Sequence, residues 1–152
     1  DRLAGKLSGG QRRKLAGSMA LLPEPDLLVL DEVTTGVDPV SRMDLWRQIA
    51  AAAAAGAAVV LATSYLDEAE RASQVLLLHE GLALTSGTPQ AVIAAMKGSV
   101  VDVAAPQDGA TAWRRGRGWR QWNPDVSQLN SNGVRLEDVA IVAELAAEAA
   151  TP

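Results

Sequence analysis

Two short stretches of this chain carry residue types that can do chemistry. In Ser8-Gly9-Gly10, a serine that favours helix N-caps precedes two glycines at the expected start of a helix. The unpaired N–H groups of such a turn favour an anion, and glycine lets the anion approach the backbone closely. In Asp31-Glu32, two adjacent carboxylates follow a run of apolar residues. Together the two stretches predict a site for a phosphate and a hydrated metal ion.

The two carboxylates suit different tasks. Mg²⁺ keeps several waters and takes few protein carboxylates, so Asp31 suits magnesium binding through water. Glu32 is then free to act as a general base toward an attacking water. The alternative is that both side chains only cap the next turn, just as Ser8 can be an ordinary helix cap. We favour function because open α/β sheets bind ligands at the carboxyl ends of their strands.

The flanking residues predict the elements that must position these groups. Apolar residues at helical spacing predict a helix over residues 9–22, which two prolines end. Residues 27–30 form a short, continuous apolar run, which predicts a buried strand of a parallel sheet covered on both faces. A helix over residues 39–55, with Asp38 as its cap, and a second buried strand over residues 57–63 follow.

Strands and helices continue to alternate further along the chain. The expected elements are a helix over residues 66–72, a strand over 74–79, a strand up to residue 85 and a helix that ends near residue 98. This alternation predicts an α/β layered domain over residues 1–98. The composition then changes, and we predict a small α+β subdomain over residues 99–152 that closes with a helix over residues 136–149.

Composition excludes several kinds of site and partner. The chain of 152 residues has no cysteine and one histidine, which excludes a disulfide framework and a Cys- or His-rich zinc site. The apolar stretch 49–62 is shorter than the roughly 20 residues of a membrane span, so none is expected. Residues 113–122 are rich in arginine and tryptophan and can either stack on bases or pack the small subdomain. Because the net charge is −4, we expect no nucleic acid partner, and residues 12–14 are expected on a solvated helix face.

The order and spacing of the motifs resemble those of one family, the ABC-transporter ATPases. Leu7-Ser8-Gly9-Gly10-Gln11 resembles the signature motif of that family, the run that ends at Glu32 resembles its Walker B motif, and TTGVDP over residues 34–39 resembles its D-loop. SYLDEAER, LLLHEG, SGTP and RLEDV are similar to the second half and tail of exporters of the drug-efflux type. The resemblance implies the C-terminal part of a P-loop NTPase, RecA-like core over residues 1–98.

The resemblance also implies a role for each matching residue. Residues 7–11 and Asp38 would bind ATP, and Asp31 would hold Mg²⁺. Glu32 would polarise the attacking water, with Ser64 beside it in the switch loop. Asp38 is also an ideal helix cap, and the two roles can coexist.

Partners and location are implied in the same way. In this family the signature motif completes an ATP site on a second ATPase domain across a head-to-tail dimer. ATP binding and hydrolysis then move a transmembrane permease. The resemblance therefore implies a second ABC ATPase domain and a permease as partners, and a peripheral position at the cytoplasmic face of the cell membrane.

The sequence departs from the family pattern in three ways. Ser64 stands where the switch loop usually has a histidine, and a serine donates a hydrogen bond but carries no charge. Val33 replaces the proline usual after the Walker B glutamate. The sequence contains no G-x-x-x-x-G-K-[ST] loop. Because a signature motif also stands within ten residues of Asp1, we expect a piece of a longer protein, which alone should not hydrolyse ATP.

Two functions stay open at this point. The first is part of the ATP-binding subunit of an exporter, which couples ATP hydrolysis to transport, and Glu32 favours it. The second is a catalytically degenerate ABC domain with a structural or regulatory role in dimerisation, and Ser64 favours it.

Overall fold

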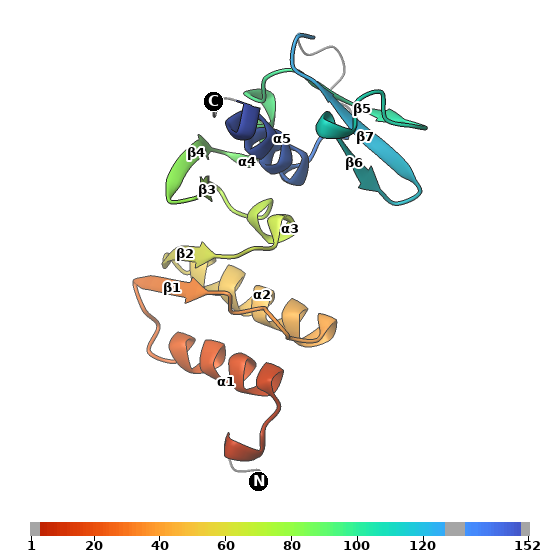
Figure 1. Cartoon of the computed structure of the whole chain (residues 1–152). Helices are drawn as coiled ribbons and strands as arrows, with labels where there is room; N and C mark the ends of the chain where they lie inside the picture. The colour runs from red at the N-terminus through yellow and green to blue at the C-terminus, as the bar shows by residue number, and fades with distance from the viewer. Residues whose placement is uncertain (1–3, 127–132, 150–152) are drawn as a thin grey trace. The chain divides into compact units, whose positions relative to one another are not determined.

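The computed structural model describes residues 4–126 and 133–149 (Figure 1). The chain divides into two compact units, Asp1–Ser64 and Tyr65–Pro152, each of which has a core of its own. Among the described residues, no helix is both long and apolar enough to cross a membrane. The boundary expected near residue 98 stays a prediction.

The first unit places two helices on one face of a small parallel sheet. Its elements in chain order are the 3₁₀ helix η1 (Ala4–Lys6), α1 (Gly9–Leu21), β1 (Leu27–Asp31), α2 (Pro39–Ala54) and β2 (Ala58–Ala62). Strands β1 and β2 pair in parallel, from Leu27 opposite Ala58 to Asp31 opposite Ala62. Each helix begins at the predicted residue, with Ser8 and Asp38 as N-caps.

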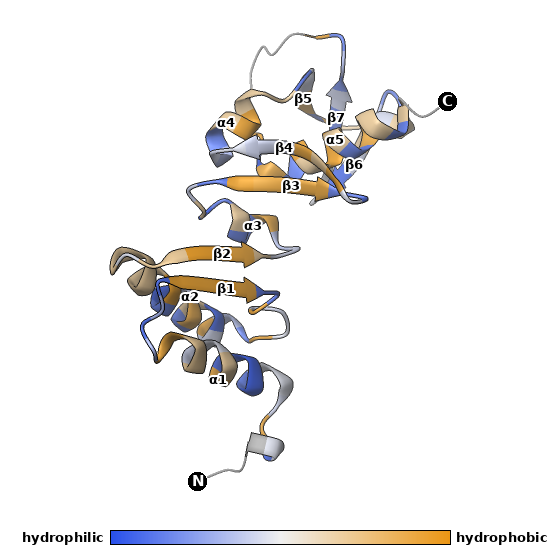
Figure 2. Cartoon of the chain, turned by 90° about the vertical axis from the view of Figure 1, so that its left-hand side faces the viewer, coloured by the Kyte–Doolittle hydropathy of each residue, from blue (hydrophilic) through white to orange (hydrophobic). Residues whose placement is uncertain are grey.

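The core of this unit lies between the sheet and its helices. Leu28 and Leu30 of β1 are buried against Leu45 and Ile49 of α2. Figure 2 shows apolar residues along both strands, with α1 and α2 on one side of the pair. Leu27 and Val29 point away from the helices and are 56% and 65% exposed. The expectation of a sheet covered on both faces is therefore wrong for the described residues, because both helices pack on the same face.

The described residues of the second unit form a hairpin, a three-stranded antiparallel sheet and three α-helices. Its elements are α3 (Leu66–Ala69), β3 (Val75–His79), β4 (Leu82–Gly87), α4 (Pro89–Ala94), β5 (Ser99–Val103), the 3₁₀ helix η2 (Gly109–Thr111), β6 (Ala112–Arg115), β7 (Gly118–Asn123) and α5 (Leu136–Ala149). Strands β3 and β4 pair with each other, and the second sheet has the order β5-β7-β6. Its core gathers Val92, Met96, Trp122, Val139 and Val142.

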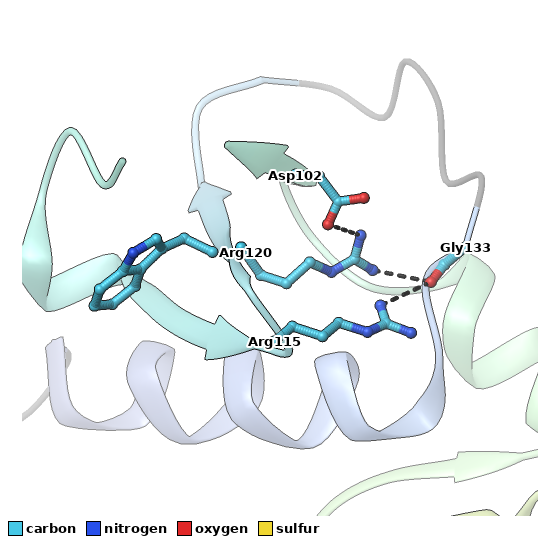
Figure 3. Close-up of a pocket in the computed structure, with 6 residues that line it drawn as sticks. Asp102, Arg115, Arg120 and Gly133 are labelled. Atoms are coloured by element: carbon cyan, nitrogen blue, oxygen red, sulfur yellow. Dashed lines mark hydrogen bonds and ion pairs between the residues drawn. The ribbon is translucent and has the colours of Figure 1, made fainter. Parts of the chain in front are cut away.

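A buried ion pair joins the three-stranded sheet to α5. The Arg120 guanidinium on β7 is bound to both carboxylate oxygens of Asp138, through Nη2 at 2.6 Å and Nε at 3.2 Å. It also binds Asp102 and the carbonyl of Gly133, to which Arg115 donates as well (Figure 3). The side chains of both Arg120 and Asp138 are at most 3% exposed. The hydrogen bonds that Arg120 donates to Asp138 raise the pKa of Arg120, so its guanidinium stays protonated.

The tryptophan-rich stretch serves this unit as packing material. Trp122 is buried, and its indole N–H donates to the carbonyl of Lys97 at 3.0 Å. The Arg114 guanidinium lies over the Trp119 ring, 5.0 Å from its centre. Of the two interpretations open from the sequence, these contacts support packing.

Candidate functional site

The signature turn starts α1 with a reciprocal pair of hydrogen bonds. The Gln11 N–H donates to Ser8 Oγ at 3.2 Å, and the Ser8 N–H donates to Gln11 Oε1 at 3.0 Å. Ser8 and Gly9 are exposed, and the first turn of α1 holds no acidic residue. The positive end of the helix dipole therefore meets no carboxylate from its own first turn, and an anion can approach it.

The start of α1 lies directly against the D-loop of the same chain. A Cβ atom added at Gly10 would stand 2.7 Å from the carbonyl oxygen of Gly36, closer than side chains tolerate. The second glycine of the signature motif is thus required by packing within the chain. Arg13, one turn further along, donates from its guanidinium to the carbonyl oxygen of Thr35. Arg13 and Lys14 are therefore more than part of a solvated face, since Lys14 also pairs with Asp44 at 3.2 Å.

Glu32 follows β1 in an uncommon backbone conformation. Its φ of 46° lies in the left-handed region, which non-glycine residues rarely adopt. Its N–H donates to the carbonyl of Ala62 at 3.0 Å, which extends the pairing of β1 with β2 by one bond. This geometry turns the side chain toward the first residues after both strands.

Two donors hold the Glu32 carboxylate. The Thr35 hydroxyl donates to Oε2 at 2.5 Å, and the backbone N–H of Ser64 donates to Oε1 at 2.8 Å. The hydrogen bond from Thr35 is the largest cause that lowers the pKa of Glu32, and Ser64 and the charge of Arg13 lower it further. Glu32 is thus an oriented, ionised carboxylate, and each oxygen retains a second lone pair for a water.

The other predicted site residues lie around this carboxylate in different ways. Asp31 is exposed at the end of β1, on the face that the helices leave bare. Asp38 accepts the Ser41 N–H at 3.0 Å, and this bond lowers the pKa of Asp38. It is therefore a helix cap, and its expected contact with a partner domain stays a prediction. Leu7 is half-buried just before the helix cap.

Sequence reasoning missed Arg13 and Thr35 as parts of the site. Thr35 lies within the TTGVDP segment, but its hydroxyl contact with Glu32 depends on how the loop turns after the strand. Arg13 is 22 residues before Thr35 in the sequence, and no pattern of residue types predicts that pairing. The cavity drawn in Figure 3, of about 420 Å³, lies in the second unit and is lined by none of the predicted site residues.

Comparison with known proteins finds homologues of one kind. No protein-family model matches the chain. Over 108 residues, or 71% of this chain, it is 45% identical to the probable multidrug ABC transporter ATP-binding protein YbhF of Escherichia coli K12, of which the match covers 19%. It is 37% identical over 112 residues to the Nod factor export ATP-binding protein I of Burkholderia orbicola, covering 72% of this chain and 37% of the relative. The chain is homologous to the ATP-binding proteins of ABC transporters.

Further similarities agree with this homology. The daunorubicin resistance ATP-binding protein DrrA2 of Streptomyces coeruleorubidus is 38% identical over 108 residues, which is 70% of this chain and 34% of that protein. A solved ATP-binding subunit of an ABC transporter superposes with a TM-score of 0.56 at 31% identity, over 59% of this chain and 38% of that one. The predicted α/β, P-loop NTPase fold class is thereby confirmed. The chain spans only 19% to 37% of the length of the curated relatives compared.

Proposed function

We propose that this chain is the C-terminal part of the ATP-binding subunit of an ABC exporter, in which Glu32 is the general base for ATP hydrolysis. The observation that carries the proposal is the held carboxylate: Glu32 stands at the end of a parallel strand with one donor on each oxygen. Open α/β sheets bind their ligands at this end of the strands. The names of the relatives support export as the process that the subunit serves.

The residues present fit Mg²⁺ and ATP in part. Asp31 is an exposed carboxylate at the strand end, which suits an ion that keeps several waters. The Ser8-Gly9-Gly10 turn suits a terminal phosphate, because its N–H groups face no acidic residue of the first helical turn. Because residues 7–11 resemble the signature motif, which in that family completes an ATP site across a head-to-tail dimer, we propose that the phosphate at this turn belongs to ATP held by a second ABC domain. When bound, Mg²⁺ would neutralise charge on the phosphates.

This chain's own residues then have defined tasks. Ser8 and Gly10 present donors to the partner's phosphate, Glu32 accepts a proton from the attacking water, and Ser64 and Thr35 orient Glu32. We also propose a transmembrane permease as the partner that is moved, and hence a position at the cytoplasmic face of the membrane.

The test is Glu32→Gln in the full-length subunit. We expect ATP affinity to stay within about twofold and turnover to fall at least about 10²-fold, the lower end of general-base contributions. The control is Glu24→Gln, because Glu24 is exposed in the turn before β1 and lies outside the site. A Glu32→Gln variant with the turnover of the wild type would remove Glu32 from the role of base.

A second candidate function rests on Ser64. A serine brings no positive charge to the γ-phosphate, which agrees with a degenerate ABC domain that serves dimerisation. If the wild-type subunit dimerises with ATP but does not hydrolyse it, this second function is the correct one.

A further inference from the structure

Arg13 and Arg12 are neighbours on α1 with different surroundings. The guanidinium of Arg13 donates to the carbonyl oxygen of Thr35, and its Nη1 lies 3.0 Å from the position that a Cβ of Gly36 would take. The side chain of Arg12 is exposed and makes no hydrogen bond or ion pair with the part of the chain that the structure describes. Arg13 therefore makes a specific contact, whereas Arg12 represents the ordinary solvated charge at this helix face.

Thr35 connects that contact to Glu32. Its carbonyl is held by Arg13, while its hydroxyl donates to Glu32 Oε2 at 2.5 Å and its N–H donates to the Glu32 carbonyl at 3.1 Å. The Ser64 N–H binds the other carboxylate oxygen, Oε1, at 2.8 Å. A continuous series of contacts thus runs from α1 through Thr35 and Glu32 to the end of β2.

Close packing fixes the spacing of α1 from the loop and from α2. Gly10 leaves no room between the helix and the Gly36 carbonyl, since an added Cβ would lie 2.7 Å from it. A Cβ at Gly17 would likewise stand 2.9 Å from Leu45 Cδ1 on α2. Because α1 packs this closely at two points, the helix backbone that carries Arg13 is held in place while the Arg13 guanidinium contacts Thr35.

We propose that Arg13 is a positioning residue for Glu32: it holds the carbonyl of Thr35, and the Thr35 hydroxyl in turn orients the carboxylate. This series of contacts connects the start of α1 to the carboxylate of Glu32 in the same chain. This inference rests on the proposed role of Glu32 for its consequence in catalysis, but the positioning itself is measurable without hydrolysis.

The first measurement is amide hydrogen exchange at Ser64 by NMR, in the full-length subunit without nucleotide. Arg13→Met removes the donor but retains the length of the side chain. We expect it to loosen Glu32 and to speed the exchange of the Ser64 amide about 2- to 12-fold, the range for one lost hydrogen bond. The amide of Ser41, which Asp38 holds, should keep its exchange rate. Arg12→Met is the matched control and should leave both amides unchanged.

A double-mutant cycle tests the path through Thr35. Thr35→Val removes the hydroxyl and should itself speed exchange at Ser64. If Arg13 acts through this hydroxyl, Arg13→Met adds nothing to Thr35→Val. Arg13→Lys, which can still donate to the Thr35 carbonyl, should restore the slow exchange of the wild type. Additive effects of the two substitutions, or equal effects of Arg12→Met and Arg13→Met, would overturn the proposal.

The second measurement is steady-state ATP hydrolysis by the same variants. Arg13→Met should lower kcat about 2- to 12-fold with an unchanged KM for ATP, because it disturbs the orientation of a base and no binding contact. If the Ser64 amide exchanges faster in Arg13→Met but kcat is unchanged, the catalytic consequence is refuted. If the wild-type subunit hydrolyses no ATP, the proposed function fails, and the exchange experiment still decides whether Arg13 positions Glu32.

Discussion

Ser8→Asp separates the two tasks that Ser8 can have. In the structure Ser8 caps α1 by accepting the Gln11 N–H. Aspartate is as good a cap as serine, and its charge suits the positive end of the helix dipole. The folded monomer should therefore retain its stability. A carboxylate at this exposed position would repel a phosphate brought by a second domain, so the interaction between domains should weaken.

The size of the loss follows from the contact that is removed. A hydrogen bond to a charged group contributes about 1.5 to 3 kcal/mol, which corresponds to about 10- to 150-fold in a binding constant. Charge repulsion adds to this, so ATP-driven dimerisation should weaken by at least about tenfold. Ser8→Asn is the matched control, since it retains a cap of similar strength without the charge.

The assay uses the full-length subunit made slow by Glu32→Gln. Light scattering measures the ATP dependence of dimerisation, and a fluorescence titration measures the ATP affinity of the monomer. We expect Ser8→Asp to weaken ATP-dependent dimerisation and to leave the ATP affinity of the monomer within about twofold. If Ser8→Asp dimerises like its Asn control, or if the monomer loses its ATP affinity, the phosphate at this turn is not the partner's.

Two further predictions concern stability. Asp138→Ala should lower the free energy of unfolding by about 3 to 5 kcal/mol, because it leaves the buried Arg120 guanidinium without its main partner. The control Asp125→Asn, at an exposed position, should leave this free energy almost unchanged. The free energy of unfolding is measured by urea titration, followed by tryptophan fluorescence. The titration uses a Trp46→Phe background, because the remaining tryptophans of the chain lie in the second unit. A loss below about 1 kcal/mol on Asp138→Ala would contradict the burial argument. Asp38 has a lowered pKa in the folded state, so its cap stabilises the protein above the ordinary aspartate pKa and is lost as the pH falls through the lowered value. The stability difference between wild type and Asp38→Ala should therefore shrink in acid, and a pH-independent difference would refute it.

Local signals in the sequence predicted most of the elements. Ser8 and Asp38 are caps that act within one helical turn, and both helices begin where these residues predict. The helix Leu136–Ala149 has the predicted bounds, because its apolar spacing is regular. Strands β6 and β7 were not predicted, since arginine, glycine and tryptophan alternate there without a clear apolar period. Strand β7 also makes non-local contacts, among them the ion pair of Arg120 with Asp138, which local sequence does not indicate.

The candidate site was predictable only in its residue types. Glu32 stands after an apolar run, and the rule for strand ends marks that position. Glu32 itself has a φ of 46°, and its carboxylate is held by the Thr35 hydroxyl and by the N–H of Ser64, which lies 32 residues further along the chain. These contacts depend on the register of β1 with β2, which brings Asp31 opposite Ala62. No pattern within one element contains that register.

The contact between Ser64 and Glu32 also bears on residue 64, where the switch loop of the family usually has a histidine. The bond at 2.8 Å is made by the backbone N–H of Ser64, and every residue except proline would supply that donor. A serine in place of the histidine of the family pattern therefore retains this backbone donor to Glu32 but lacks a group that can carry charge or accept a proton. In the proposed mechanism Glu32 would still orient a water, but the proton that it takes would leave without an imidazole. If Glu32 is the base that we propose, the expected result is therefore a slow hydrolytic step and not an absent one.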